Sequence, residues 1–183
     1  VYNKTAQHKF VPDCYKYNSK EVRIAVLQGL MDTDGTIDKL GHSSFCSTSK
    51  RLAKDVQFIV RSLGGKATIT EKEPFYKDSD NNRKYCNTAY TVHIQIANQA
   101  DLFRLTRKRA RAVKFNGGTT IPKLRLKNVV NVGIKKCKCI TIDHPLGLFI
   151  TTDFIVTHNS GKSSCLIVDP LRYCTNKNFR ALI

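Results

Sequence analysis

Residues 27–35 read Leu27-Gln28-Gly29-Leu30-Met31-Asp32-Thr33-Asp34-Gly35, and they close a predicted helix. Ser19, upstream of them, can cap that helix through its hydroxyl group. Apolar residues then recur at the spacing of one helix face: Val22, Val26, Leu27, Leu30 and Met31. Because a glycine follows the two carboxylates, we expect a helix that begins near Ser19 and presents Asp32 and Asp34 at its carboxyl end.

This stretch resembles the LAGLIDADG motif of DOD-type homing endonucleases, with Gln28 in place of the first Ala and Met31 in place of Ile. The resemblance implies that Gly29 lets two such helices cross closely. It also implies that Asp34 binds Mg²⁺ for phosphodiester hydrolysis, whereas Asp32 is structural. A capped helix followed by an ordinary Asp-Gly turn is the competing interpretation.

The residues that follow predict two hairpins separated by a helix. Residues 43–49 are expected to form a β-hairpin, and a helix follows whose apolar face ends at Gly64-Gly65. Two further strands are expected over residues 66–71 and 85–97, joined by a polar loop over residues 77–84. The predicted fold is α+β: helix, hairpin, helix, hairpin and helix around an antiparallel sheet, as in one half of a LAGLIDADG endonuclease.

The same resemblance implies that this sheet lies in the major groove of double-stranded DNA. Four side chains are candidates for contacts with phosphates or base edges, and each is alternatively a solvated surface residue: Arg83, Lys84, His93 and Gln95. The basic cluster RLTRKRAR, residues 104–111, is expected on a helix and has the same two interpretations.

Lys9 stands in the sequence Lys9-Phe10-Val11-Pro12, where the family has a Lys-x-Ile-Pro block. The resemblance implies that its ammonium group stabilises phosphate charge during catalysis. An ordinary surface lysine is the alternative.

A second chemistry is indicated by VTHNSGKS, residues 156–163. The side-chain amide of Asn159 can attack its own main-chain carbonyl and cut the bond that follows. His158 can stabilise the developing charge, and the hydroxyl of Ser160 can carry an acyl group. Short strands are expected over residues 140–143, 149–151 and 153–157. An ordinary polar turn is the alternative for the tripeptide.

Residues 139–159, CITIDHPLGLFITTDFIVTHN, resemble the two C-terminal splicing blocks of an intein, in the Hint domain. By that resemblance His158 assists, Asn159 cyclises and Ser160 receives the transferred segment. Cys139 replaces the usual aspartate and is either a branching nucleophile used together with Thr157 or a buried small residue. Gly147 stands where many inteins carry a histidine.

Gly161-Lys162-Ser163 is the second half of a GxxxxGK[ST] phosphate loop whose first glycine is missing. We therefore expect Lys162 to contact ATP phosphates and Ser163 to coordinate Mg²⁺ only after the glycine-rich half is joined. Residues 160–183 resemble the start of the ATPase domain of phage terminase large subunits, so the intein is expected to interrupt the Walker A loop of such a protein.

Composition supports a polyanion partner. The 183 residues carry 31 Lys and Arg against 14 Asp and Glu, a net charge of +17. We expect a cytoplasmic protein of a bacterial or phage-infected cell, with no membrane partner. The seven cysteines are expected to be reduced thiols, and Cys137 and Cys139 lack a second pair at zinc-finger spacing.

Three segments are therefore predicted: an endonuclease half over residues 1–118, a splicing segment over 119–159 and an ATPase fragment over 160–183. The intein's N-terminal half is a further expected partner, because one LAGLIDADG helix and no N-terminal splicing block are present. Two alternatives stay open: a freestanding or dimeric LAGLIDADG endonuclease or RNA maturase without splicing, and a DNA-binding ATPase subunit.

Overall fold

The computed structural model describes residues 5–114, 128, 130, 131, 133, 134, 142, 143 and 145–158. The chain divides into two units, Val1–Pro122 and Lys123–Ile183, and each is described by itself. Cys139, Asn159, Ser160, Gly161, Lys162 and Ser163 lie outside the described residues.

The first unit is mixed α and β. Its elements are η1 (Ala6–His8), α1 (Asp13–Lys16), α2 (Lys20–Thr33), β1 (Gly35–Ile37), β2 (Ser43–Ser47), α3 (Lys50–Ser62), β3 (Lys66–Lys72), β4 (Phe75–Lys77), β5 (Arg83–Tyr85), β6 (Ala89–Gln95), η2 (Gln99–Leu102) and α4 (Thr106–Lys114). The predicted order of helix, hairpin, helix, hairpin and helix is confirmed by α2, β1–β2, α3, β3–β6 and α4.

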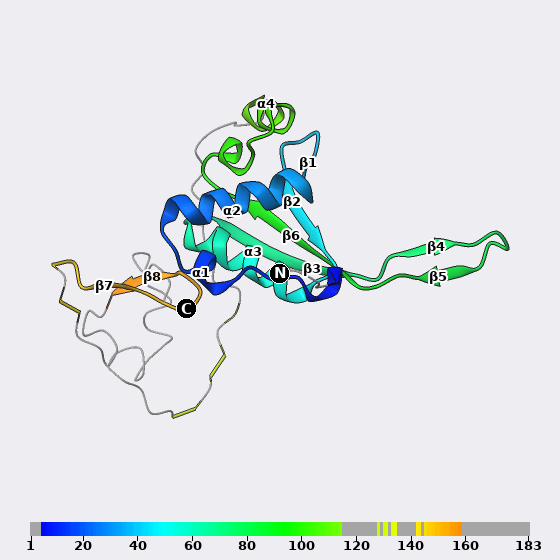
Figure 1. Ribbon diagram of the computed structural model, residues 1–183. Helices are drawn as coiled ribbons and strands as arrows, with labels where there is room; N and C mark the ends of the chain where they lie inside the picture. The colour runs from blue at the N-terminus through cyan, green and yellow to red at the C-terminus, as the bar shows by residue number, and fades with distance from the viewer. Residues whose placement is uncertain are drawn as a thin grey trace. The chain divides into compact units, whose positions relative to one another are not determined.

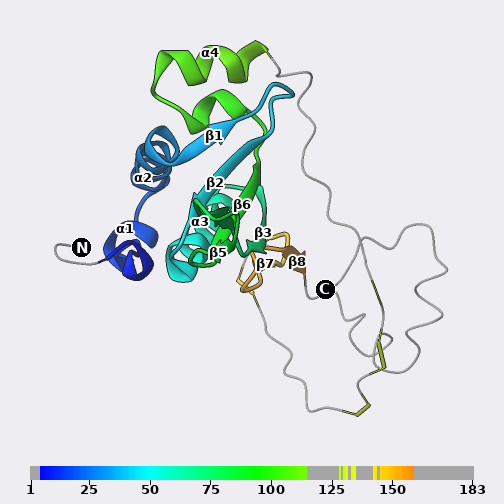
Figure 2. The same cartoon turned by 90° about the vertical axis from the view of Figure 1, so that its right-hand side faces the viewer.

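A four-stranded antiparallel sheet with strand order β1-β2-β6-β3 is the centre of this unit. Figures 1 and 2 show α2 and α3 on the same face of the sheet. That face holds the core, because apolar side chains alternate along the strands toward the helices. Its fully buried members include Met31, Phe45, Val56, Ile59 and Val92.

The two long helices begin where hydroxyl groups cap them. The Ser19 hydroxyl accepts a hydrogen bond from the Val22 N–H at 3.5 Å, and the Ser49 hydroxyl accepts one from the Leu52 N–H at 3.1 Å. Helix α3 ends at Ser62 and is followed by Leu63 and Gly64, whose φ of +80° is a left-handed conformation that glycine adopts without strain.

Three details of the predicted hairpins were wrong. Residues 43–49 are not a hairpin by themselves, because Ser43–Ser47 is one strand whose hairpin partner is Gly35–Ile37. The strand expected over residues 85–97 is interrupted after Tyr85 and resumes at Ala89. The loop expected over residues 77–84 is shorter, because its ends belong to strands β4 and β5.

Strands β4 and β5 form a separate two-stranded sheet that projects from the body of the first unit as an arm (Figure 1). All residues of both strands are exposed. The Asp78 carboxylate accepts hydrogen bonds from the Asp80 and Asn82 N–H groups at the tip. The Arg83 guanidinium lies 4.7 Å from the centre of the Phe75 ring.

In the second unit, β7 (Leu148–Ile150) pairs antiparallel with β8 (Val156–His158). The predicted strand over residues 149–151 is shifted by one residue. The one expected over 153–157 begins later, because Phe154 has a φ of 61° within the turn. Ile142 and Asp143 lie in no strand, although they were predicted to; Ile140 and Thr141 are outside the described residues.

Candidate functional site

Asp34 stands at the junction of α2 and β1. Its N–H donates to the Leu30 carbonyl at 3.0 Å and closes the last turn of the helix, and its side chain is exposed. A β-carbon on the next residue, Gly35, would lie 2.5 Å from the Met31 carbonyl oxygen. The glycine therefore allows the strand to leave the helix at this tight angle.

Asp32 has a different role, as its carboxylate accepts hydrogen bonds from the backbone N–H groups that precede α4. The distances to the Arg104 and Leu105 nitrogens lie between 3.1 and 3.3 Å. These bonds satisfy donors that have no partner within α4. The structural role predicted for Asp32 agrees with this geometry.

Lys108 of α4 also contacts the junction of α2 and β1. Its ammonium nitrogen donates to the carbonyls of Met31, Asp32 and Gly35 at 2.8, 2.9 and 2.6 Å. An ammonium group has three N–H donors, so all of them are used on this one turn. Burial lowers the pKa of Lys108 from its ordinary value, Arg107 lowers it further, and Asp32 and Asp34 oppose the shift.

Sequence reasoning did not single out Lys108, which lies inside the basic cluster 104–111. No spacing in the sequence marks it, because its contacts with the end of α2 depend on where the fold places α4. Gln28 strengthens the same contact, since its side chain donates to the Asp101 carbonyl at 2.9 Å and accepts from the Arg104 Nε at 2.8 Å.

The face of the sheet opposite the helices is polar and largely exposed, and we call it the open face. Its side chains come from four strands: Thr36, Ser44, Cys46, Lys66, Thr68, Thr70, Lys72, Thr91, His93 and Gln95. Side chains of neighbouring strands are joined by hydrogen bonds, at 3.0 Å between the Thr36 and Ser44 hydroxyls, which are in register, and 3.0 Å between the Thr70 hydroxyl and His93 Nε2, which are diagonal neighbours. No acidic side chain of these strands is on this face.

The predicted DNA contacts divide between two surfaces. His93 and Gln95 are on the open face, whereas Arg83 and Lys84 are on the arm formed by β4 and β5. The structure therefore does not bring the four together. Lys84 also forms an ion pair with Asp78, with 3.4 Å between the charged atoms.

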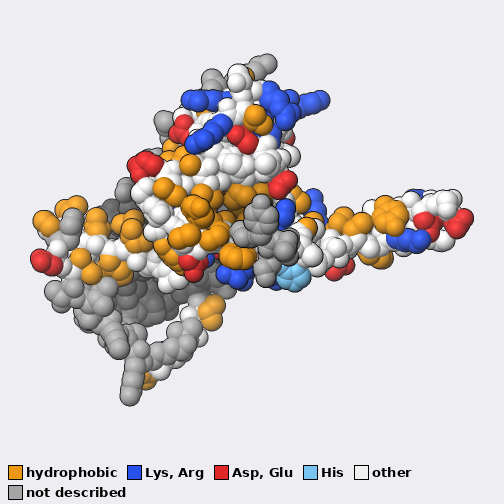
Figure 3. All heavy atoms as spheres, in the orientation of Figure 1, with side chains coloured by type: hydrophobic (Ala, Val, Ile, Leu, Met, Phe, Trp, Pro, Cys, Tyr) orange, Lys and Arg blue, Asp and Glu red, His pale blue; other side chains and the backbone are white. Residues whose placement is uncertain are grey.

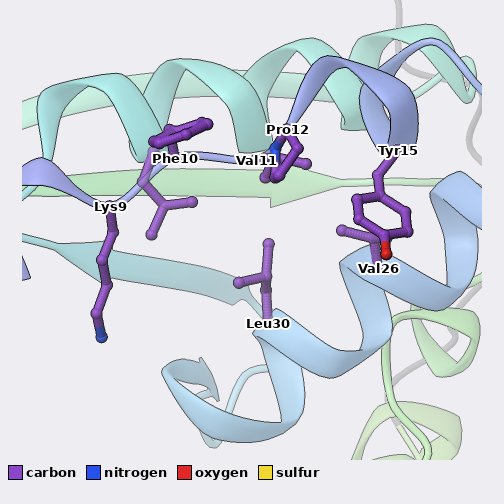
Figure 4. Close-up of a pocket in the computed structure, with 8 residues that line it drawn as sticks. Lys9, Phe10, Val11, Pro12, Tyr15, Val26 and Leu30 are labelled. Atoms are coloured by element: carbon purple, nitrogen blue, oxygen red, sulfur yellow. The ribbon is translucent and has the colours of Figure 1, made fainter. Parts of the chain in front are cut away.

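Lys9 lies at the rim of an apolar pocket of about 320 Å³ between the N-terminal segment and α2. Figure 4 shows its ammonium group pointing away from Phe10 and Pro12. The Lys9 carbonyl accepts a hydrogen bond from the Ser49 hydroxyl at 2.6 Å. Among the described residues no contact joins the Lys9 ammonium to Asp34, so its catalytic role stays a prediction.

The helix face that borders this pocket is left open. Val26 and Leu30 line the pocket, and both are only partly buried. A β-carbon on Gly29 would meet no atom within 4 Å. Helix α2 therefore presents a smooth face around Gly29, at the edge of the core against which Val26 and Leu30 pack.

A magnesium ion would find one suitable carboxylate at this junction. The Asp34 carboxylate makes no hydrogen bond to a described residue, which leaves its oxygens available. Mg²⁺ is often held by one or two carboxylates together with water and phosphate oxygens, so Asp34 fits as part of such a site. No group of three or more His, Cys, Asp and Glu side chains within the described residues could hold a metal alone.

Of the splicing residues, Thr157 is described in full and His158 in its backbone. Thr157 is half-buried opposite Phe149, and His158 is the last residue of β8, opposite Leu148. The splicing roles of all these residues stay predictions, and Cys139, Asn159 and Ser160 lie outside the described part.

A comparison with known protein families matches the part of the chain that contains the junction of α2 and β1. Residues 21–109 match the LAGLIDADG-like domain. Domains of this kind are typically nucleases that bind double-stranded DNA and use a divalent metal ion. The matched residues include all of α2 except Lys20, the whole four-stranded sheet and the first turn of α4, and therefore Asp34 and Lys108.

The chain is also 28% identical over 177 residues to the replicative DNA helicase DnaB of Mycobacterium intracellulare. That similarity covers 96% of this chain and 29% of the helicase, so the chain spans less than a third of the relative. In the described part of the chain, no helix is long and apolar enough to cross a membrane.

Proposed function

We propose that the first unit is one half of a Mg²⁺-dependent homing endonuclease that cuts double-stranded DNA. The observation that carries this proposal is the exposed Asp34 carboxylate, fixed where α2 meets the sheet. The open face without acidic side chains supports it, because a B-DNA major groove admits a β-ribbon and repels carboxylates.

The residues of this chain would act as follows. Short hydroxyl side chains of the open face let the sheet approach the groove, and His93 and Gln95 reach base edges. Asp34 provides oxygen ligands for the metal next to the scissile phosphate. When bound, Mg²⁺ activates water and stabilises the leaving oxygen. Lys108 holds the turn that carries Asp34, and Lys9 is proposed to lie near the phosphate.

A second LAGLIDADG helix is proposed to pack on the smooth face of α2 around Gly29. The absence of a side chain there allows two helices to approach closely. The apolar pocket beside Val26 and Leu30 would receive side chains of the other half. Each half would then contribute one carboxylate to the groove.

The test of the nuclease is Asp34→Asn in the full chain combined with its N-terminal half. We expect the variant to bind target DNA and to lose Mg²⁺-dependent cleavage. Asp80→Asn, an exposed aspartate at the tip of the arm, is the matched control and should cleave normally. Cleavage by the Asp34 variant at the control rate would remove Asp34 from the active site.

We further propose that the second unit is the C-terminal part of an intein. In that role His158 assists, Asn159 cyclises, and Ser160 accepts the N-terminal segment as an ester. Cys139 and Thr157 would provide the branching chemistry. Support comes from the order of these residues and from β8, which ends on His158 directly before Asn159.

Splicing is tested in the full precursor. Asn159→Ala should stop release at the bond between residues 159 and 160, and ligated host protein should not form. Cys139→Ser separates the two interpretations of Cys139, since a branching nucleophile would be slowed and a buried small residue would not. Ligated product from the Asn159 variant at the normal rate would refute the proposed splicing site.

For the host we propose an ATPase whose Walker A loop is completed by Gly161, Lys162 and Ser163. A phage terminase is proposed from the residues after Ser163, and the similarity to a DNA helicase supplies a second candidate. An upstream coding sequence that ends in a glycine-rich half-loop would support either. A freestanding endonuclease or maturase is favoured instead if no such half exists.

A further inference from the structure

The side chains of the basic cluster, residues 104–111, differ in the contacts that they make. Lys108 is used within the protein, as its three donors are bound to backbone carbonyls. Arg104, Arg107 and Arg111 have exposed side chains. No ion pair joins their guanidinium groups to a carboxylate in the described part of the chain. Figure 3 shows Lys and Arg side chains gathered over the region of α4.

These arginines share a direction. Arg107 and Arg111 are four residues apart on α4, so they lie on one side of the helix. Arg104 lies just before the helix begins, one turn from Arg107. The three thus form a row, which we call the arginine stripe, beside the turn that carries Asp34.

Two members of the stripe are held in place while most of their donors stay available. The Arg104 Nε donates to Gln28 at 2.8 Å, and one terminal nitrogen of Arg111 donates to the Ile37 carbonyl at 3.2 Å. Arginine has five N–H donors in a fixed plane. Each guanidinium group can therefore bind a phosphate after losing little further conformational freedom.

We propose that the arginine stripe binds the phosphate backbone of duplex DNA next to the strand held at Asp34. This inference rests on the proposed nuclease function and adds a second DNA-binding surface, outside the open face. Such contacts carry no sequence information, so the stripe positions the duplex and does not select its sequence.

The test compares two charge-matched double variants of the full chain. Arg107→Gln with Arg111→Gln removes two charges from the stripe. Lys20→Gln with Lys54→Gln removes two exposed charges from α2 and α3. Binding of two unrelated 40-base-pair duplexes, a length of about four helical turns, is followed by fluorescence anisotropy over a series of salt concentrations.

We expect the stripe variant to bind both duplexes more weakly, by the same factor. The slope of log Kd against log salt should fall by about 2, since each phosphate contact contributes about 1. The control should change the slope by less than half as much. Equal slopes for the two variants would overturn the proposal.

Two further variants test whether the change in slope comes from the lost charges and not from misfolding. Arg107→Gln alone removes a side chain with no hydrogen bond to a described residue, so it should fold normally and lower the slope by about 1. Arg107→Lys with Arg111→Lys keeps the charges and should restore the slope. Cleavage is measured separately on target DNA, with the N-terminal half added. Asp34-dependent cleavage with an unchanged slope refutes the stripe alone, whereas a changed slope without cleavage in that mixture refutes the nuclease alone.

Discussion

Gly29 and Gly35 belong to the same nine-residue stretch but are glycines for different reasons. A β-carbon at residue 35 would collide with the backbone of Met31, whereas one at residue 29 would meet open space. Gly35→Ala should therefore destabilise the protein by about 1–3 kcal/mol through overpacking. Gly29→Ala should stabilise the isolated chain by about 0.5–1 kcal/mol, because alanine is the better helix former.

Urea denaturation of the two variants checks this pair. The same Gly29→Ala variant should bind the N-terminal half more weakly, since the proposed helix pairing needs close approach. Stabilisation by alanine at both positions would show that the junction at Gly35 is looser than its geometry indicates.

Asp38, in the turn between β1 and β2, makes the stability of the fold depend on pH. The His42 backbone N–H donates to its carboxylate and, with smaller contributions from the His42 ring and the Leu40 N–H, holds the pKa of Asp38 below its usual range. A lowered folded pKa stabilises the fold above the unfolded value near 3.8, and this contribution is lost as the pH falls through the folded value. Asp38→Ala should lower the urea midpoint at pH 7.

The same substitution should have a smaller effect at pH 3, because the unfolded carboxyl is largely protonated there and the contribution of the lowered pKa is reduced. Denaturation curves of wild type and variant at the two pH values check the sign. A difference that is larger at pH 3 would contradict it.

At the scale of elements, α2 and α4 are joined through reciprocal contacts. Asp32 of α2 satisfies backbone donors before α4, and Lys108 of α4 satisfies carbonyls at the end of α2. Lys108→Met should therefore move the Asp34 turn and lower kcat at least tenfold, with a smaller effect on KM. Arg109→Met, which removes an exposed neighbouring charge, is the control and should affect KM more than kcat.

The elements themselves were largely predictable, and the reason is the regular spacing of apolar residues. Helix α3 is the clearest example, because Leu52, Val56, Ile59 and Val60 are all buried on one face. The break between β5 and β6 was not predictable. Asn87 is disfavoured in strands, but the sequence does not show that β5 pairs with β4 in a sheet of its own.

The arm formed by β4 and β5 has exposed side chains throughout and does not belong to the core. Replacing residues 75–85 with an Asn-Gly turn should therefore change the free energy of unfolding by less than about 1 kcal/mol. Thermal denaturation checks this, with Val92→Ala in the core as the control that should cost more. A large loss of stability would show that the arm supports the sheet.

At the scale of the whole molecule, the described residues provide one helix that resembles the LAGLIDADG motif, α2, with the Asp34 carboxylate at its end. We expect it to bind duplex DNA at low salt and to make no double-strand cut by itself. Adding the N-terminal half should give a 1:1 complex and Mg²⁺-dependent cleavage, and EDTA should abolish the cleavage without releasing DNA. Leu30→Glu, on the smooth face of α2, should prevent the complex in analytical ultracentrifugation.

The site at this scale was only partly predictable. The motif at residues 27–35 predicted that Asp34 stands at the carboxyl end of a helix, and its position there is fixed by local sequence. The partners of that turn are brought to it by the fold, from residues more than seventy positions away, and sequence spacing carries no sign of them. The open face shows the same limit, because which strands are neighbours decides which side chains form it.

Cys46 stands on the open face, Cys86 follows the arm, and Cys14 lies on α1, each with an exposed thiol. One alkylating reagent can therefore report on three regions of the same molecule at once. Duplex bound in the proposed way would slow iodoacetamide labelling at Cys46 and leave the labelling rate of Cys14 unchanged. Peptide mass mapping of a partly labelled sample would then show which side of the protein the nucleic acid covers, without any substitution.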